Sequence, residues 1–215
     1  MSFVGGVGYS NIDLIYSGLD RLPDKGEEIF ARGFSMQFGG GIPATMINLS
    51  RLGVESRIIT FAGHDLFSEF VKKTLNSYPV KTVNLYKGNK MPVVLSSTLL
   101  YCGDRSFISY TDGMDLNDAV MDEVYENLKG AYVVDMHVGF LDVYKRLKKD
   151  GCIQIFDTGW EDDLTLEKYR DYLGIADYYI PNQKEAMKIT GTSSVEAAAD
   201  VLSEFFSDVT IKMDK

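Results

Sequence analysis

Short apolar runs alternate with amphipathic runs along most of the chain. Apolar runs typical of buried strands cover residues 3–8, 56–62, 131–136, 153–156, 178–180 and 209–213. Segments with helical spacing cover residues 43–52, 66–76, 118–128, 142–149, 165–173 and 183–190, and capping-box spacing at Ser193 and Glu196 predicts one more helix that ends near residue 206. Because strands and helices take turns, the pattern predicts an α/β fold whose mostly parallel sheet is flanked by helices.

Two stretches interrupt this alternation, at about residues 13–38 and 80–110. The first alternates apolar and polar side chains on either side of a turn-like Pro23-Asp24-Lys25-Gly26. The second holds the strand-like run MPVVLSSTLLY and a turn at residues 102–105. Both patterns predict antiparallel hairpins, which can pair into a small β sheet of their own. Such a sheet suits a lid over the ligand edge of the main sheet, and an ordinary extension of the main sheet fits equally well.

Length and composition restrict the class of protein. The 215 residues allow one large domain or two small ones, and a hydrophobic content of 45% excludes a mainly disordered chain. Two cysteines, Cys102 and Cys152, are too few for a disulfide scaffold or a structural zinc site. The sequence has no apolar run of membrane length and no secretory signal, so we expect no membrane partner and a cytoplasmic location.

The net charge of the chain further restricts the kinds of partner that it can bind. Lys and Arg number 22 against 31 Asp and Glu, which gives a formal net charge of −9. An acidic chain repels phosphate backbones, so we expect no nucleic-acid partner. A local basic pocket for one small phosphate is compatible with this charge.

Polar side chains follow most of the expected strands. In chain order they are Asn11, Asp13, Asp65, His137, Asp157, Asn182, Glu185 and Lys212. Ligands of open parallel sheets bind beyond the carboxyl ends of the strands, and carboxylates and amides there would suit a polyhydroxyl ligand and a divalent cation. Each of these residues could instead cap a helix. We favour capping for Asp65 and Asp157, and a structural role for His137.

A run of three glycines, Gly39–Gly41, leads into the first expected helix, with Pro43 in its first turn. Glycine lets a ligand approach the backbone closely, and a helix start offers N–H groups, although a plain flexible turn explains the same letters. The stretch at residues 6–11 misses the dinucleotide pattern GxGxxG because Asn11 replaces its last glycine, and the sequence has no Walker-type GxxxxGK[ST].

Four segments together resemble the ribokinase-like, PfkB-type carbohydrate kinases. VGGVGYSNIDLI resembles the first strand and N-x-D sugar-binding element of that family, and FGGGIPATMINLSRLG with IITFAGHDLFSEF resembles its N-terminal signature. PNQKEAMKITG resembles the PN-x-x-E segment, and VTIKMDK resembles the strand that leads into the nucleotide-binding loop. The resemblance extends over nearly the whole chain and implies a ribokinase-like fold with a small antiparallel β lid.

The resemblance also implies a function. It implies transfer of a phosphoryl group from ATP, with Mg²⁺, to a sugar or related small alcohol. In that scheme Asn11, Asp13, Gly39, Gly40, Gly41 and His137 bind the substrate, and Asn182, Glu185 and Lys212 bind the nucleotide. Glu185 would hold the Mg²⁺ ion through water. The lid of such kinases often forms a dimer interface, which implies a homodimer.

Three departures from the family pattern change the expectation. Ala44 stands where the family has an Asn that meets sugar hydroxyls, and Asp214 stands where the family has Gly. The Gly-Ala-Gly-Asp loop, which supplies the catalytic base of the family, does not occur in the sequence, so we expect this base to lie beyond Lys215. We therefore expect residues 1–215 to be an incomplete kinase domain without its C-terminal part, a truncated form that is itself inactive.

Two other functions remain open from the sequence. A non-catalytic sugar-binding or interaction module on a kinase fold would explain Ala44, Asp214 and the missing loop. A nicotinamide-dependent oxidoreductase has only the imperfect glycine pattern in its favour.

Overall fold

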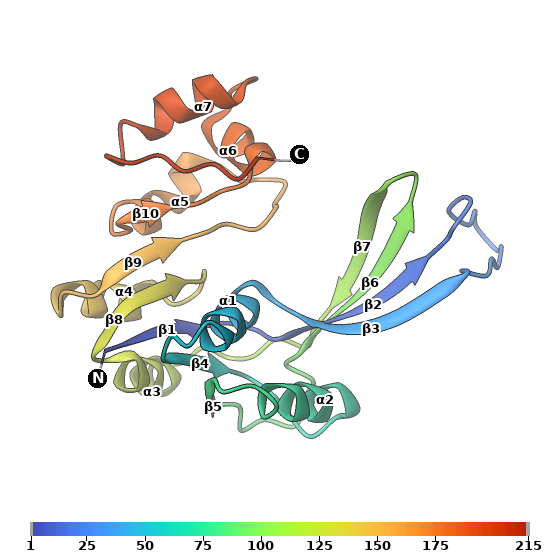
Figure 1. Cartoon of the computed structure of the whole chain (residues 1–215), viewed down its shortest axis with the longest axis horizontal. Helices are drawn as coiled ribbons and strands as arrows, with labels where there is room; N and C mark the ends of the chain where they lie inside the picture. Colours follow the sequence, from blue (N-terminus) through green and yellow to red (C-terminus); the bar gives the residue numbers. More distant parts are fainter. Residues whose placement is uncertain (1, 214–215) are drawn as a thin grey trace. The chain divides into compact units, whose positions relative to one another are not determined.

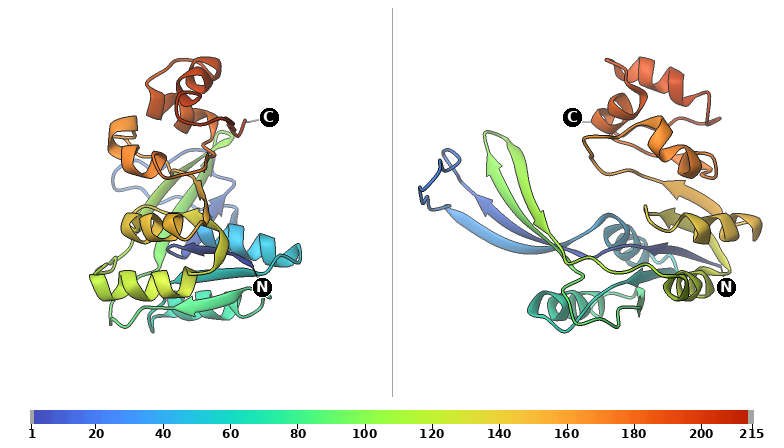
Figure 2. Two further views of the ribbon diagram at one scale, coloured as in Figure 1. Left: turned by 90° about the vertical axis from the view of Figure 1, so that its left-hand side faces the viewer. Right: turned by 180° about the vertical axis from the view of Figure 1, so that it is seen from behind.

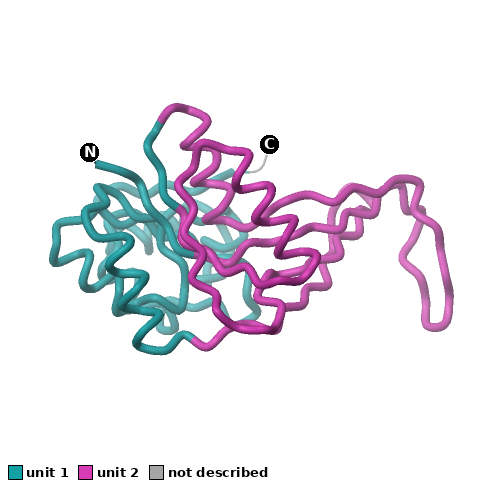
Figure 3. The backbone as a smooth tube through the Cα atoms, turned by 90° about the horizontal axis from the view of Figure 1, so that it is seen from below, with its two compact units in different colours: residues 1–7, 54–57, 116–215 teal, residues 8–53, 58–115 magenta. Residues whose placement is uncertain are grey.

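The computed structural model describes residues 2–213, which divide into two compact units (Figure 3). Unit 1 comprises residues 1–7, 54–57 and 116–215, and unit 2 comprises residues 8–53 and 58–115. Each unit therefore collects segments that are far apart in the sequence. Among the described residues, no helix has the length and apolar character needed to cross a membrane.

A six-stranded sheet forms the larger of two sheets, in the order β10-β9-β8-β1-β4-β5 (Figure 1). Its strands are β1 (Phe3–Val7), β4 (Ser56–Thr60), β5 (Lys81–Asn84), β8 (Ala131–Met136), β9 (Ile153–Phe156) and β10 (Tyr178–Tyr179). The pairs β1–β8, β8–β9 and β9–β10 are parallel. This sheet confirms the predicted α/β class.

Buried and less buried side chains alternate along the strands of unit 1, and helices of the same unit pack on these strands. Val134, Met136 and Phe156 point to the buried side, whereas their neighbours along β8 and β9 are half-buried or exposed. Phe156 stacks on Tyr172 with the ring centroids 5.3 Å apart. The left panel of Figure 2 shows α3, α4 and α5 in a row along one side of these strands. The helices of unit 1 are α3 (Asp118–Leu128), α4 (Leu141–Lys149), α5 (Leu166–Leu173), α6 (Gln183–Thr190) and α7 (Val195–Leu202).

Unit 2 holds helices α1 (Gly41–Arg51) and α2 (Leu66–Leu75) and a four-stranded sheet. The small sheet has the order β3-β2-β6-β7, with β2 (Asn11–Ser17), β3 (Gly33–Gly39), β6 (Val94–Tyr101) and β7 (Asp104–Tyr110). Both predicted hairpins are confirmed, since β2–β3 and β6–β7 are antiparallel. They join through the parallel pair β2–β6, so the sheet is mixed rather than purely antiparallel. Residues 81–84, which the sequence pattern assigned to the second hairpin, form β5 of the larger sheet instead.

Two elements near the end of the chain differ from prediction. Residues 209–213 form no strand, because their recorded pairing is a single bridge between Lys212 and Asn182. The partner segment begins with Pro181, which has no N–H to extend a ladder. Helix α7 is capped by Ser194, whose hydroxyl accepts the N–H of Ala197, rather than by a Ser193–Glu196 box, and it ends at Leu202.

One departure from the family pattern, Asp214 in place of Gly, lies outside the described part of the chain. Its consequence for the site therefore stays a prediction.

Candidate functional site

One face of the small sheet in unit 2 carries the predicted sugar-binding pair, Asn11 and Asp13. Side chains alternate between the faces of a strand, and the register places Asp13 level with Gln37 on β3 and Ser96 on β6. Asn11 Nδ2 donates to Asp13 Oδ1 at 2.9 Å and lies 3.2 Å from Ser96 Oγ. Ser96 Oγ is in turn 2.7 Å from Ser109 Oγ on β7. Amide, carboxylate and hydroxyl groups from three strands therefore share one face.

The Asp13 carboxylate is suited to accept hydrogen bonds from hydroxyl groups. Burial raises the pKa of Asp13 above its ordinary value of 3.8, and the positive charge of Arg105 partly opposes that rise. Gly39 lets this carboxylate lie directly against the β3 backbone, since a Cβ on Gly39 would lie 2.7 Å from Asp13 Oδ2. One of the glycines of the Gly39–Gly41 run thus packs against the Asp13 carboxylate.

Gly40 and Gly41 have different roles in the turn that follows. Gly40 has φ of 103°, a conformation that glycine adopts far more readily than other residues, and a Cβ there would lie 2.8 Å from the Tyr9 carbonyl oxygen. Gly41 is the first residue of α1, and a Cβ added to it would meet no atom within 4 Å. Helix α1 begins without a side-chain cap, and Pro43 occupies its first turn as predicted. Ala44 is exposed in that turn and offers no polar group.

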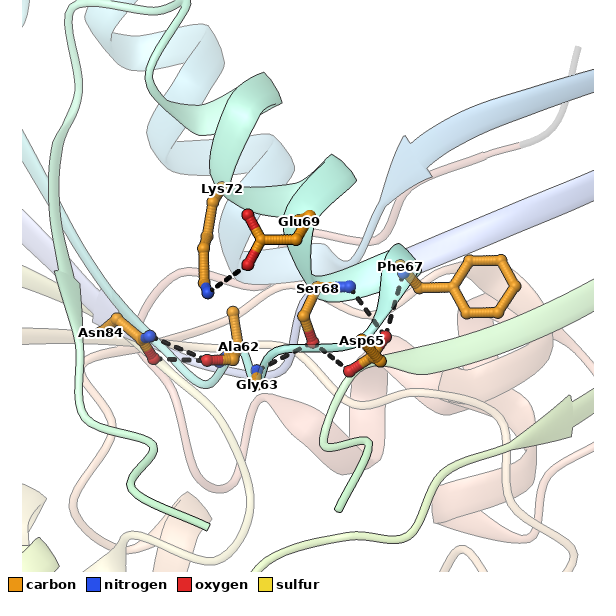
Figure 4. A network of polar contacts seen from close by, with 8 residues as sticks. All are labelled: Ala62, Gly63, Asp65, Phe67, Ser68, Glu69, Lys72 and Asn84. Carbon is orange, nitrogen blue, oxygen red and sulfur yellow. Dashed lines mark hydrogen bonds and ion pairs between the residues drawn. The ribbon is translucent and has the colours of Figure 1, made fainter. Parts of the chain in front are cut away.

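Asp65, which follows β4 in the segment that resembles the family's N-terminal signature, has a structural role (Figure 4). Its Oδ1 accepts the N–H groups of Phe67 and Ser68 at the start of α2, and its Oδ2 accepts the Ser68 hydroxyl at 2.6 Å. Ser68 Oγ also accepts the N–H of Gly63, which fixes the loop after β4. Burial opposes ionisation of Asp65, but these hydrogen bonds together lower its pKa. The predicted capping role of Asp65 is confirmed.

The predicted nucleotide-binding residues come together in unit 1, beyond the carboxyl ends of β9 and β10. Asn182 and Glu185 form a capping box at the start of α6, in which each side chain accepts the backbone N–H of the other at 2.9 Å. Lys212 joins this segment through its backbone, because its N–H donates to Pro181 and its carbonyl accepts from Gln183. The Lys212 ammonium donates to Asp157 Oδ2 at 2.5 Å.

Asp157 therefore does not cap a helix, and the capping prediction for it is wrong. The next helix, α5, is capped by Thr165, whose hydroxyl accepts the N–H of Lys168. That cap lies well beyond Asp157 along the chain. The Asp157 carboxylate forms an ion pair with the Lys212 ammonium. The sequence could not reveal this pair, since its members are 55 positions apart.

The carboxylates of unit 1 influence one another. Burial raises the pKa of Glu185, and the negative charge of Asp157 raises it further, whereas the Asn182 N–H and Lys212 oppose the rise. Burial also raises the pKa of Asp157, against the hydrogen bond and charge of Lys212. The Lys212 ammonium is thus the cation whose charge acts on both carboxylates.

Within residues 2–213, no group of three or more His, Cys, Asp or Glu side chains could hold a metal ion without help. Mg²⁺ usually keeps several waters and is held by one or two carboxylates together with substrate phosphates. The buried Glu185 carboxylate, at a helix start and close enough to Asp157 to feel its charge, fits that mode of binding.

His137 lies after β8 in unit 1, and its bonds match a structural residue. Its backbone N–H donates to the Tyr144 hydroxyl, its Nδ1 is 2.8 Å from the Val138 carbonyl oxygen, and its ring meets Phe140 edge-on. Burial lowers the pKa of His137, which favours the neutral form of the ring. A role for His137 in substrate binding stays a prediction.

Comparisons with known proteins identify the family to which the chain belongs. A model of the pfkB family of carbohydrate kinases matches residues 1–213. A Pyrococcus horikoshii protein named as a sugar kinase is 35% identical over 92 residues, which cover 40% of this chain and 30% of that relative. The ribokinase of Arabidopsis thaliana, solved with ribose and ATP, has a TM-score of 0.76 at 22% identity and matches 99% of this chain and 72% of its own.

The ribokinase of Giardia lamblia has a similar fold, with a TM-score of 0.82 at 17% identity over 99% of this chain and 70% of its own. The chain thus spans about 70% of these solved ribokinases and matches less than a third of the Pyrococcus relative. The structural likeness supports the fold, and the family match covers nearly every residue. The chain belongs to the pfkB family of carbohydrate kinases.

Proposed function

We propose that the protein binds a sugar or related small alcohol together with ATP, and that it serves ATP-dependent phosphorylation of that alcohol. Membership of a carbohydrate kinase family supports this activity, and so does the likeness to a ribokinase solved with ribose and ATP. Transfer of a phosphoryl group depends mainly on positioning and on charge stabilisation. In this proposal the cluster around Asp13 positions the alcohol, and the cluster around Lys212 provides charge stabilisation.

The polar face in unit 2 is the proposed sugar site. Asp13 accepts hydrogen bonds from sugar hydroxyls, Asn11 orients the carboxylate, and Gly39 leaves room for that carboxylate. Ala44 removes one amide that other family members offer, so fewer hydroxyls of the ligand are met here. His137 is proposed as a further substrate contact on the family resemblance alone.

The cluster in unit 1 is the proposed nucleotide site. Lys212 attracts the phosphates, and Asn182 and Glu185 at the start of α6 organise the segment that faces them. Mg²⁺, held through water by Glu185, would neutralise charge that develops on the transferred phosphoryl group.

The observation that carries the proposal is the Asp13 carboxylate, which Asn11 holds by a hydrogen bond and which lies against Gly39. A carboxylate fixed in this way can accept hydrogen bonds from a polyhydroxyl ligand. Titration calorimetry tests it with a panel of pentoses, hexoses and polyols against the wild-type protein and the variants Gly39→Ala and Gly159→Ala. We expect Gly39→Ala to lose the sugar, because the added methyl group displaces Asp13 Oδ2, and Gly159→Ala to keep it, because a Cβ there meets no atom within 4 Å.

A second function is favoured by a specific feature of the sequence. Ala44 stands where the resemblance to the family leads us to expect an Asn that meets sugar hydroxyls, and its methyl group offers no hydrogen bond. A non-catalytic sugar-binding module therefore remains our alternative. Sugar-dependent formation of ADP by these 215 residues would refute it, and sugar binding without any turnover would support it.

The apolar face of the small sheet supports a homodimer. Tyr16 and Phe34 pack together with ring centroids 5.3 Å apart, and Ile108 and Tyr110 lie on the same face by register. The side chains of Phe34 and Ile108 are 61% and 70% exposed. Exposed apolar side chains that lie together on one face often mark a protein–protein interface. We propose that a second copy of the chain covers this face. Sedimentation of Ile108→Asp should then show a monomer where the wild-type protein shows a dimer.

A further inference from the structure

One ion pair of unit 1 lies where a ligand is expected. Asp157 follows β9 directly, and its Oδ2 receives the Lys212 ammonium at 2.5 Å. Both side chains are half-exposed, at 42% and 49%. Other Lys–Asp pairs of this unit join elements of the scaffold: Lys145–Asp171 links α4 to α5, and Lys148–Asp177 also supports the backbone N–H of Gln154. The Asp157–Lys212 pair instead stands beyond the carboxyl end of a parallel strand.

The backbone of Lys212 is fixed independently of this pair. Its N–H donates to the Pro181 carbonyl at 2.8 Å, and its own carbonyl accepts the N–H of Gln183 at 3.0 Å. The side chain can therefore change partners while the main chain stays in place. Glu185, in the first turn of α6, is the other carboxylate on which the Lys212 charge acts.

We propose that the Asp157–Lys212 pair is a latch, in which Asp157 is a positioning residue that holds the Lys212 ammonium in the free protein and releases it to the phosphates of an arriving nucleotide. This inference rests on the proposed function, since it takes the ligand of this cluster to be a nucleoside triphosphate. Exchange of partners is feasible because an exposed ion pair contributes little free energy and a polyphosphate offers several negative charges to one ammonium. No bond is made or broken beyond this exchange of ionic partners.

The latch has two consequences. Without nucleotide, the pair keeps the Lys212 ammonium on Asp157 rather than on Glu185. With nucleotide, the ammonium must first leave the Asp157 carboxylate. Asp157 should therefore weaken the binding of free ATP, and this penalty should require Lys212.

Three variants separate this role from a structural one. Asp157→Asn removes the holding charge, Lys212→Met removes the ammonium, and Asp171→Asn removes one negative charge from an ion pair elsewhere in unit 1. Lys212 acylation by a water-soluble ester, followed by mass spectrometry, reports whether the ammonium is held. Titration with ATP in the absence of Mg²⁺ and at low salt reports the exchange, and thermal melting checks that each variant is folded.

We expect Asp157→Asn to speed acylation of Lys212 and to bind free ATP about two- to fivefold more tightly, the range that corresponds to a weak ion pair. Asp171→Asn should match the wild-type protein in both measurements, and Asp157→Asn should change ATP affinity far less when Lys212→Met is also present. Equal acylation rates and ATP affinities in wild type and Asp157→Asn, with ATP binding measurable in both, overturn the latch and leave the proposed function intact. If neither binds ATP, the proposed nucleotide site fails and the latch fails with it.

Discussion

The two clusters use opposite means to hold their central side chain. In unit 2, the Asp13 carboxylate is held by a neutral amide on a face that also carries serine hydroxyls, and a Cβ on Gly39 would lie against it. In unit 1, the Lys212 ammonium is held by a carboxylate and lies among other charged groups. Hydrogen bonds to hydroxyl groups depend on direction, whereas the attraction between opposite charges acts on phosphate over a longer range. The two clusters therefore favour different kinds of ligand, as the proposed binding of a sugar and a nucleotide requires.

The clusters also differ in what supports them. The unit 2 cluster depends on backbone geometry at Gly39 and Gly40, where an added methyl group would meet Asp13 or the Tyr9 carbonyl. The unit 1 cluster depends on a capping box and on one bridge to Lys212. Substitutions of glycine should therefore damage the first cluster, and changes of charge or salt the second.

The most severe loss should follow from Gly40→Ala. The positive φ and the contact with the Tyr9 carbonyl both oppose a Cβ, so we expect unfolding free energy to fall by about 2–4 kcal/mol. Urea denaturation measures it, with Gly41→Ala as the control that should stay within about 0.5 kcal/mol of wild type. Similar losses in both variants would mean that the turn does not need glycine at position 40.

Next in size is the loss of sugar affinity in Asp13→Ala. Hydrogen bonds to a charged group contribute about 1.5–3 kcal/mol each, so affinity should fall about tenfold to a hundredfold. Titration with the sugar that the panel identifies measures it, while ATP affinity in the same variant should be unchanged. Unaltered sugar binding would remove Asp13 from the proposed site.

A smaller effect is expected when the cap of α2 is removed. Asp65→Ala should lower the unfolding free energy by about 1 kcal/mol, the usual contribution of an N-cap. Chemical denaturation at pH 7 gives the value. ATP binding in this variant should equal that of wild type, and a selective loss of ATP would show that Asp65 does more than cap the helix.

Salt should separate the two sites without any mutation. Raising NaCl from about 50 to about 500 mM screens exposed charges, so free ATP should bind several-fold more weakly while the affinity for a neutral sugar changes little. Parallel titrations at both salt concentrations measure the two affinities. Equal salt dependence for the two ligands would contradict the division into a directional and an ionic site.

The pH dependence of stability should have opposite signs at Asp13 and Asp65. The pKa of Asp13 is raised in the folded protein, so its ionisation costs stability as pH rises from 3.8 through the folded pKa. The pKa of Asp65 is lowered, so its contribution is present above 3.8 and is lost as pH falls through the folded pKa. Comparing Asp13→Asn and Asp65→Asn with wild type between about pH 3 and pH 7 should show differences of opposite slope. This effect should be weaker than the others because both groups are partly exposed.

Much of the fold was predictable from local pattern. Periodicity identified the strands at residues 131–136 and 153–156 and the helix at residues 183–190 with matching boundaries. The pattern failed at residues 209–213, which are apolar enough for a strand but have only one bridging partner. Local sequence carries no information on whether a partner strand is in place.

Less of the candidate site was predictable. Asn11, Asp13 and the glycines were found because they occur close together in a motif. Ser96 and Ser109 were missed, since only the parallel pairing of β2 with β6 brings them to the face of Asp13. The available signal in the sequence was the alternation of side chains with a period of two residues. This alternation does not reveal which residues of neighbouring strands lie side by side. Asp157 was assigned to a cap because its ion pair spans 55 positions.

Whether sugar and nucleotide bind to different clusters can be tested directly. Calorimetric titration of Asp13→Asn and Lys212→Met, each with ATP and with the sugar that wild type binds, gives four affinities. We expect a crossed result, in which Asp13→Asn loses the sugar but keeps ATP, and Lys212→Met loses ATP but keeps the sugar. Loss of both ligands in either folded variant, or of neither ligand in both, would disprove the separation of the two sites.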